Sequence, residues 1–219
     1  MHRLLLLLPL FLLTTCTQPL AKKRLLVIGD SNGEKQGWVY ELQNLRGGGP
    51  LVNTALSGNT VGFNYGGNRT MNTLENLTTY LRKGYAEMGG IDEVLIGLGT
   101  NDCKVDFADR RADIEKNLNL LLDRSVAFFE ERGQEVPNFV LLTPPPLDDT
   151  NVVAEFADAT ACVAAVAATV KKIGAERGYC VVDLQSDPGD AALEHSYDGI
   201  HYRVPGYKML AGAVIDACY

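Results

Sequence analysis

The sequence lacks the features that mark several classes of protein. It contains no run of Lys or Arg long enough to form a nucleic-acid footprint, and its net charge is −7. It has no CxxC pair, and its His, Asp and Glu residues do not cluster at the spacing of metal ligands. No internal repeat and no linker is evident. We therefore expect one globular domain that binds no nucleic acid, and we predict no metal and no cofactor.

Charged residues are also scarce at the N-terminus, where residues 4–13 are apolar. This run follows Arg3, precedes small polar residues and is too short to span a bilayer comfortably. Such a pattern is typical of an export signal rather than of folded structure. We predict that residues 1–21 form this signal and that residues 22–219 form the folded domain.

Two cleavage sites are compatible with the signal. Residues 13–16, LTTC, resemble a bacterial lipobox, although Thr15 stands where Gly, Ala or Ser is usual; cleavage there leaves a lipid-modified Cys16. The alternative is cleavage after Ala21, where Pro19 takes the place of a small residue. We favour the lipobox. The predicted location is periplasmic or at the cell surface as a lipoprotein, or secreted, with membrane contact through the lipid anchor alone.

Cysteine is infrequent, and its number is even once Cys16 is set aside. The four remaining cysteines would lie in a compartment where disulfides persist. Three pairings are possible and the sequence does not choose between them; four free buried thiols are the alternative. The candidates for disulfides are Cys103, Cys162, Cys180 and Cys218.

Short apolar segments alternate with segments of helical spacing along the rest of the chain. The apolar segments are nearly continuous, which is typical of parallel strands covered on both faces. The pattern predicts a single three-layer α/β/α domain, flavodoxin-like, with a mostly five-stranded parallel sheet. The expected strands span residues 24–29, 51–56, 91–99, 138–146 and 179–184, and the expected helices span residues 37–46, 70–88, 106–132, 152–178 and 205–217.

Polar side chains follow three of the expected strands and precede the last helix. In parallel sheets, ligands bind beyond the carboxyl ends of the strands, so we expect these segments to converge at one edge. The segments are residues 29–32 (GDSN), 57–59 (SGN), 99–102 (GTND) and 198–201 (DGIH).

In order and position, these four blocks resemble those of the SGNH hydrolase superfamily, the GDSL-type esterases and lipases. The resemblance extends from about residue 24 to about residue 215. It implies a serine hydrolase that cleaves an oxygen ester through an acyl-serine intermediate. It also implies the roles of five residues: Ser31 as nucleophile, His201 as base, Asp198 as the acid that orients it, and Gly58 and Asn101 as oxyanion-hole donors together with the N–H of Ser31.

The residue types suit these roles. A Ser hydroxyl becomes a good nucleophile when a base removes its proton. His201 has Asp198 three residues earlier, whereas His195 has no comparable partner. Gly58 has no side chain, so its backbone can approach a substrate closely. The alternatives are that Ser31 is a helix N-cap and that His201 is an ordinary core or surface histidine.

Three polar neighbours complete the predicted site. We interpret Asp30 and Asp102 as supporting residues that hydrogen-bond nearby loops, rather than as catalytic groups or metal ligands. Asn32 stands where the superfamily often has Leu. Because Leu is a packing residue at this position, we interpret Asn32 as a change near the pocket that leaves the reaction type unaltered.

The substrate is less constrained than the reaction. The loop 59–68 carries Asn59, Asn64, Tyr65 and two adjacent glycines, and residues 147–151 are acidic and polar. Neither segment provides the broad apolar lid expected of a lipase. We favour a short-acyl esterase or a carbohydrate O-deacetylase acting on a small-molecule or glycan ester. The alternatives are a lysophospholipase, thioesterase or arylesterase of the same superfamily, and a catalytically inactive sugar-binding surface protein.

Overall fold

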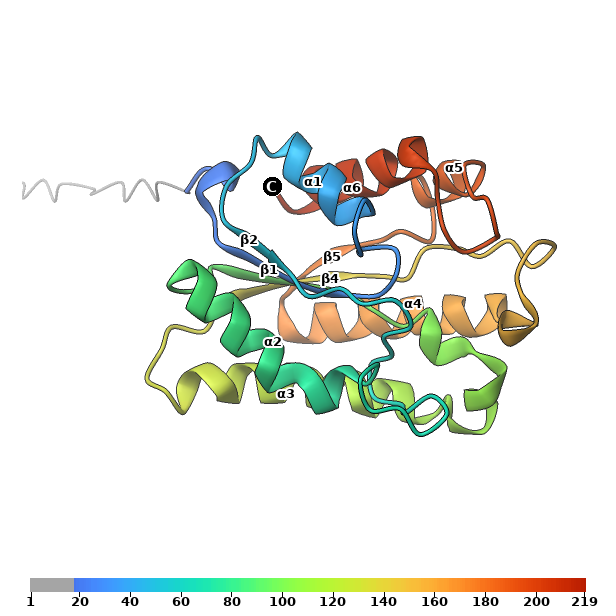
Figure 1. The fold of residues 1–219 in the computed structure, drawn as a ribbon, viewed down its shortest axis with the longest axis horizontal. Coiled ribbons are helices and arrows are strands. Elements are labelled where there is room, and N and C mark those ends of the chain that lie inside the picture. The colour runs from blue at the N-terminus through green and yellow to red at the C-terminus, as the bar shows by residue number, and fades with distance from the viewer. Residues whose placement is uncertain (1–17) are drawn as a thin grey trace, which may run out of the picture.

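The computed structural model describes residues 18–219. They form three layers, with one parallel sheet in the middle (Figure 1). The predicted lipidation site, Cys16, and the signal up to residue 17 lie outside the described residues. The strand order is β2-β1-β3-β4-β5, and every neighbouring pair is parallel. The predicted fold class is therefore confirmed. The strands are β1 (Leu25–Gly29), β2 (Leu51–Asn53), β3 (Glu93–Gly97), β4 (Asn138–Leu142) and β5 (Cys180–Val182).

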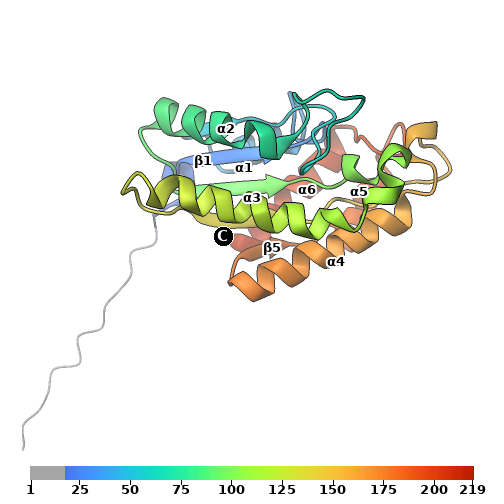
Figure 2. The same cartoon turned by 90° about the horizontal axis from the view of Figure 1, so that it is seen from below.

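Helices cover both faces of the sheet, as Figures 1 and 2 show from two directions. One layer contains α1 (Trp38–Leu45), α5 (Gly189–Leu193) and α6 (Val204–Cys218). The other contains α2 (Thr73–Met88), α3 (Asp113–Glu130) and α4 (Thr160–Arg177). Residues 18–219 also contain four short 3-10 helices: η1 (Leu20–Lys22), η2 (Asn101–Cys103), η3 (Val105–Arg110) and η4 (Ala154–Phe156). Within residues 18–219, no helix is both long enough and apolar enough to cross a bilayer.

The central strand β1 shows why the sequence forms a sheet buried on both sides. All five of its residues are buried. Leu26 and Ile28 pack in the core on the side of α2, α3 and α4, whereas Leu25 and Val27 pack in the core under α1 and α6. Successive strand residues point to opposite faces, so a continuous apolar run can supply both cores.

The structure corrects several of the expected boundaries and adds one helix. The helix expected over 106–132 is divided into η3 and α3, and in η3 Phe107 is buried with its ring centroid 4.8 Å from that of Phe63. The helix expected over 152–178 is divided before α4, where Asp158 has a φ of 57° that a helix cannot include. Strand β2 ends at Asn53, whose side chain accepts the N–H of Ala55. Helix α5 was not predicted.

Two disulfides join elements that are distant in the sequence. Cys103 pairs with Cys162, which links η2 to α4, and Cys180 pairs with Cys218, which links β5 to the end of α6. This is one of the three pairings that the sequence left open. Disulfides are typical of oxidising compartments, so both bonds are compatible with export.

Candidate active site

Ser31 lies in a tight turn that leaves the carboxyl end of β1. The turn is closed by bonds from the N–H of Gly33 to the carbonyl of Asp30 and from the N–H of Glu34 to the carbonyl of Ser31. Helix α1 begins only at Trp38, with Gly37 at its N-cap position. Ser31 therefore does not cap a helix, and the N-cap alternative for this residue is wrong.

The side chains of Ser31, His201 and Asp198 form a continuous hydrogen-bonded chain. Ser31 Oγ lies 2.8 Å from His201 Nε2, and His201 Nδ1 lies 2.7 Å from Asp198 Oδ2. Ser31 comes from the loop after β1, whereas the other two come from the turn before α6, 170 residues later. The structure thus brings together a hydroxyl, an imidazole and a carboxylate in the order that a serine nucleophile requires.

The turn that carries Asp198 and His201 is held by its own backbone. Asp198 Oδ1 accepts the N–H groups of Ile200 (3.0 Å) and His201 (2.7 Å), while its other oxygen faces the imidazole. Burial opposes ionisation of Asp198, but these hydrogen bonds outweigh it and hold the pKa of the carboxyl below its ordinary value. The carboxylate is therefore charged at neutral pH and holds a proton on Nδ1, which leaves Nε2 free to accept one from the serine.

Hydrogen-bond donors without a full set of protein acceptors lie on the neighbouring loops. Among residues 18–219, no protein group accepts the N–H of Ser31 or of Gly58. The side chain of Asn101 donates through Nδ2 to the carbonyl of Asn59 at 3.1 Å. Because an amide NH₂ has two protons, a second donor remains on this nitrogen. These are the groups that the sequence predicts for an oxyanion hole.

Gly58 occupies a position that other residues would not fill without strain. Its φ is +82°, and a Cβ built on it would lie 2.7 Å from Met71 Sδ. The positive φ favours glycine here, and a larger residue would also displace the side chain of Met71. The next residue, Asn59, connects the loop of Gly58 to the end of β1, because its Nδ2 donates to the carbonyl of Gly29 at 2.9 Å.

The two predicted supporting carboxyls are buried behind the site. Both oxygens of Asp102 lie within 3.0 Å of the backbone N of Val61, and one oxygen of Asp30 accepts the N–H of Asn32 at 3.0 Å. Burial raises the pKa of Asp30 to about 6 and that of Asp102 to about 7. Their contacts hold loops in place and do not include Ser31 or His201.

Asn32 connects the two halves of the site. Its Nδ2 donates to the carbonyl of Ile200 at 3.3 Å, and its Oδ1 accepts the hydroxyl of Tyr207 at 3.2 Å. The side chain is 3% exposed. A Leu at this position could make neither bond, so Asn32 joins the loop that carries Ser31 to the turn that carries His201 and to α6.

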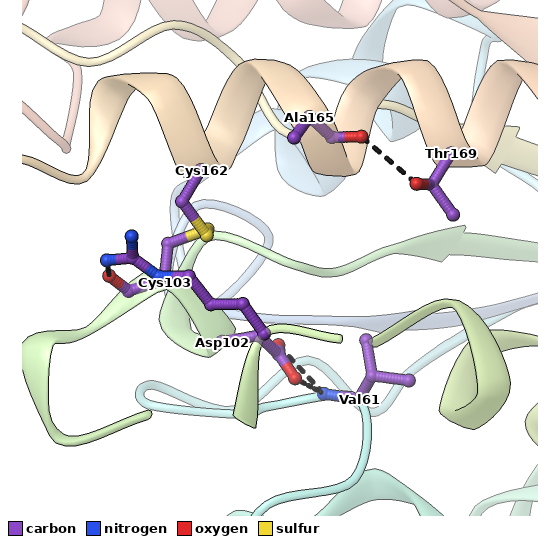
Figure 3. The surroundings of a disulfide bond; sticks show 7 residues. Val61, Asp102, Cys103, Cys162, Ala165 and Thr169 are labelled. Carbon is purple, nitrogen blue, oxygen red and sulfur yellow. Dashed lines mark hydrogen bonds between the residues drawn. A yellow bond between two sulfur atoms is a disulfide. The ribbon is translucent and has the colours of Figure 1, made fainter. Parts of the chain in front are cut away.

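The disulfide Cys103–Cys162, whose surroundings Figure 3 shows, lies close in the sequence to Asn101. Cys103 is the last residue of η2, the 3-10 helix that begins with Asn101. Figure 3 also shows the side chain of Asp102, the residue before Cys103, directed toward the backbone of Val61. Covalent attachment to α4 therefore restrains the segment that presents the Asn101 amide.

The structure changes the interpretation of the loop 59–68. Asn59 is fully buried, and Lys104 Nζ lies over the ring of Tyr65, 4.3 Å from its centroid. Asn64 accepts a hydrogen bond from Asn72. Asn59 and the ring of Tyr65 are thus engaged within the protein, whereas Asn64 is exposed.

The sequence predicted no positioning role for Asn59, which it placed in a substrate-facing loop, and no role for Tyr197. Asn59 follows Gly58 directly, and its amide side chain was the available signal. The ring of Tyr197 is stacked on that of His201, with centroids 6.0 Å apart and an angle of 20° between the planes. An aromatic residue next to the predicted acid was the signal for this second residue. No three His, Cys, Asp or Glu side chains within residues 18–219 form a group that could hold a metal ion.

Comparison with known proteins gives one family and several similar structures. The model of the GDSL-like lipase/acylhydrolase family matches residues 25–209. No curated protein sequence matches the chain significantly. Among solved structures, an aryl esterase of M. smegmatis is 20% identical with a TM-score of 0.71, and the match covers 89% of this chain and 97% of that one. A carbohydrate acetylesterase from Sinorhizobium meliloti is 21% identical (TM-score 0.70; 89% and 97% covered), and a putative arylesterase from Agrobacterium tumefaciens is 22% identical (0.70; 89% and 99%).

Proposed function

The chain belongs to the GDSL-like lipase/acylhydrolase family and is a carboxylic ester hydrolase, and from this premise we propose that Ser31 is its nucleophile. The observation that carries the proposal is the chain of contacts from Ser31 Oγ to His201 Nε2 and from His201 Nδ1 to Asp198, at 2.8 and 2.7 Å. Asp198 and His201 are then the acid and the base of a catalytic triad.

The reaction follows from this geometry. His201 takes the proton of Ser31 as Oγ attacks the carbonyl carbon of the ester. The carbonyl oxygen becomes negative and accepts the N–H groups of Ser31 and Gly58 and the free proton of the Asn101 amide. When the intermediate collapses, His201 returns the proton to the departing alcohol. Water then attacks the acyl carbon and loses its proton to His201; as the bond to Oγ breaks, His201 returns that proton to Ser31 and the acid leaves.

We further propose that the acyl group is short. Met71 fills the space beside Gly58. One of the similar structures is a carbohydrate acetylesterase, whose acyl group is the two-carbon acetyl group.

The N-terminal anchor remains a prediction, and the position of Leu20 supports cleavage before Cys16. Leu20 is half-buried and packs against the core beneath α1 and α6. The guanidinium of Arg46 donates to the carbonyl of Lys23 at 2.7 Å. Residues 18–23 are thus part of the folded domain, and cleavage after Ala21 would remove Leu20 from the core. Labelling of cells with a radioactive fatty acid, in wild type and in Cys16→Ala, tests the anchor.

A fluorophosphonate probe tests the nucleophile, because it labels serines that are activated by a base. We expect labelling of the wild type, no labelling of Ser31→Ala, and full labelling of Ser57→Ala. Ser57 is the matched control since it is an exposed serine in the neighbouring loop. Equal labelling of Ser31→Ala would contradict the proposal. A wild type that neither takes the probe nor cleaves esters, yet binds glycans, would instead indicate an inactive sugar-binding protein.

The acyl preference is measured with p-nitrophenyl esters of increasing chain length and with acetylated oligosaccharides. We expect kcat/KM to be greatest for acetate and to fall steadily toward octanoate. Release of acetate from the oligosaccharides would identify a carbohydrate O-deacetylase. A maximum at long chains would contradict the short-acyl proposal and favour a lysophospholipase or thioesterase.

A further inference from the structure

Tyr197 is an exposed aromatic residue whose backbone is fixed beside the proposed base. The residue is 54% exposed, although its ring stacks on the imidazole of His201. Its N–H donates to the carbonyl of His201 at 3.1 Å, and Ser196 Oγ donates to the same carbonyl at 2.9 Å. Ser196 also pairs with Tyr202 in an antiparallel bridge. The backbone of Tyr197 is therefore held in place while much of its ring faces solvent.

The direction of proton transfer indicates which part of a substrate lies near this ring. His201 Nε2 must return its proton to the alcohol oxygen that leaves. The alcohol portion of the ester therefore lies on the His201 side of Ser31. The carbonyl oxygen must instead lie toward the donors on Gly58 and Asn101. A ring stacked on the imidazole borders the alcohol side of the site.

Tyr65 offers a contrast among the loop tyrosines around the site. Lys104 lies over its ring at 4.3 Å, and Phe107 meets it edge-on, with centroids 6.1 Å apart. Its neighbour Glu155 forms an ion pair with Lys104 at 3.0 Å. The ring of Tyr65 is thus engaged within the protein, whereas more than half of the surface of Tyr197 is available to a ligand.

We propose that Tyr197 forms the wall of an alcohol-binding subsite that stacks on a ring in the substrate. The class of substrate is an ester whose alcohol part carries a ring with a flat apolar face, either an aryl ring or a pyranose. Aromatic rings pair in offset-stacked or edge-to-face arrangements, and such pairs gain more than the burial of their area alone. The inference rests on the proposed function, because it takes His201 as the group that protonates the departing alcohol.

Three acetate esters test the subsite: phenyl acetate, an acetylated methyl glucoside, and ethyl acetate, which has no ring. In Tyr197→Ala we expect kcat/KM for ring-bearing esters to fall about tenfold more than that for ethyl acetate, mainly through KM. Tyr197→Phe keeps the ring and should retain the wild-type ratio. Tyr40→Ala is the matched control, since Tyr40 is 49% exposed on α1 and makes no contact with the triad residues.

Each outcome has a defined meaning. Selective loss with phenyl acetate identifies an aryl subsite, and selective loss with the glucoside identifies a sugar subsite. An equal fall for all three esters, with a displaced pH profile, would show that the ring acts through His201 and would overturn the proposal; so would an unchanged ratio. Fluorophosphonate labelling of each variant distinguishes failure of the subsite proposal from failure of the proposed function. Labelling with an unchanged ratio overturns the subsite alone, whereas a wild type without label overturns the proposed function as well.

Discussion

Removal of the disulfide Cys103–Cys162 should damage both stability and catalysis. The bond joins residues 59 positions apart, and loop-closure entropy assigns it about 4 kcal/mol of stability. Cys180–Cys218 joins residues 38 positions apart, and the same relation also gives about 4 kcal/mol. The two losses should differ by only about 0.4 kcal/mol, because the cost varies with the logarithm of loop length.

The two bonds differ in what they hold. Cys103 shares η2 with Asn101, whose amide is a proposed oxyanion donor, whereas Cys180 and Cys218 link β5 to the end of α6. An oxyanion donor is typically worth about 3 kcal/mol of barrier. Two ties to η2 persist without the disulfide, from Asn101 to Asn59 and from Asp102 to Val61. We therefore expect part of the donor's contribution to be lost, about 1.4 kcal/mol or tenfold in kcat.

The assay compares two paired variants, Cys103→Ala/Cys162→Ala and Cys180→Ala/Cys218→Ala. Urea denaturation should show similar losses of unfolding free energy for both. Hydrolysis of p-nitrophenyl acetate, at a temperature where circular dichroism shows both variants folded, should show a fall in kcat for the first pair alone. Equal kcat values in the two pairs, or an equal fall in both, would refute the idea that this disulfide positions Asn101.

Three further perturbations test individual contacts. Asn32→Leu removes an acceptor from the buried Tyr207 hydroxyl and should cost about 1–3 kcal/mol in urea denaturation; adding Tyr207→Phe should recover part of this, and a purely additive loss would contradict the contact. Burial raises the pKa of Asp102 to about 7, so the folded protein binds this proton more tightly than the unfolded chain. The unfolding free energy of the wild type should therefore fall relative to that of Asp102→Asn as the pH rises from about 4 to about 7; a constant difference would contradict the shift. Gly58→Ala places a methyl group 2.7 Å from Met71 Sδ. The value of kcat/KM should fall about tenfold while the protein stays folded. Wild-type kinetics would refute the close packing.

Much of the fold was predictable because its signals are local. The continuous apolar run in β1 indicated a strand buried on both faces, and the structure confirms it. The helix expected over 106–132 was wrong for the opposite reason. Its spacing is helical, but the segment is divided into η3 and α3, and η3 packs Phe107 against Phe63, a distant contact that no local pattern contains.

The sequence by itself determined the parallel α/β architecture and the residues that the family resemblance picks out at the ends of strands, because periodicity and chain order are properties of the linear chain. Tertiary structure decided which groups meet across long separations. It paired Cys103 with Cys162, placed His201 against Ser31, and made Asn32 a bridge to Tyr207. It also left the ring of Tyr197 exposed beside the imidazole. Contacts between side chains 59 to 175 residues apart depend on the packing of whole layers, and no short segment of sequence records that packing.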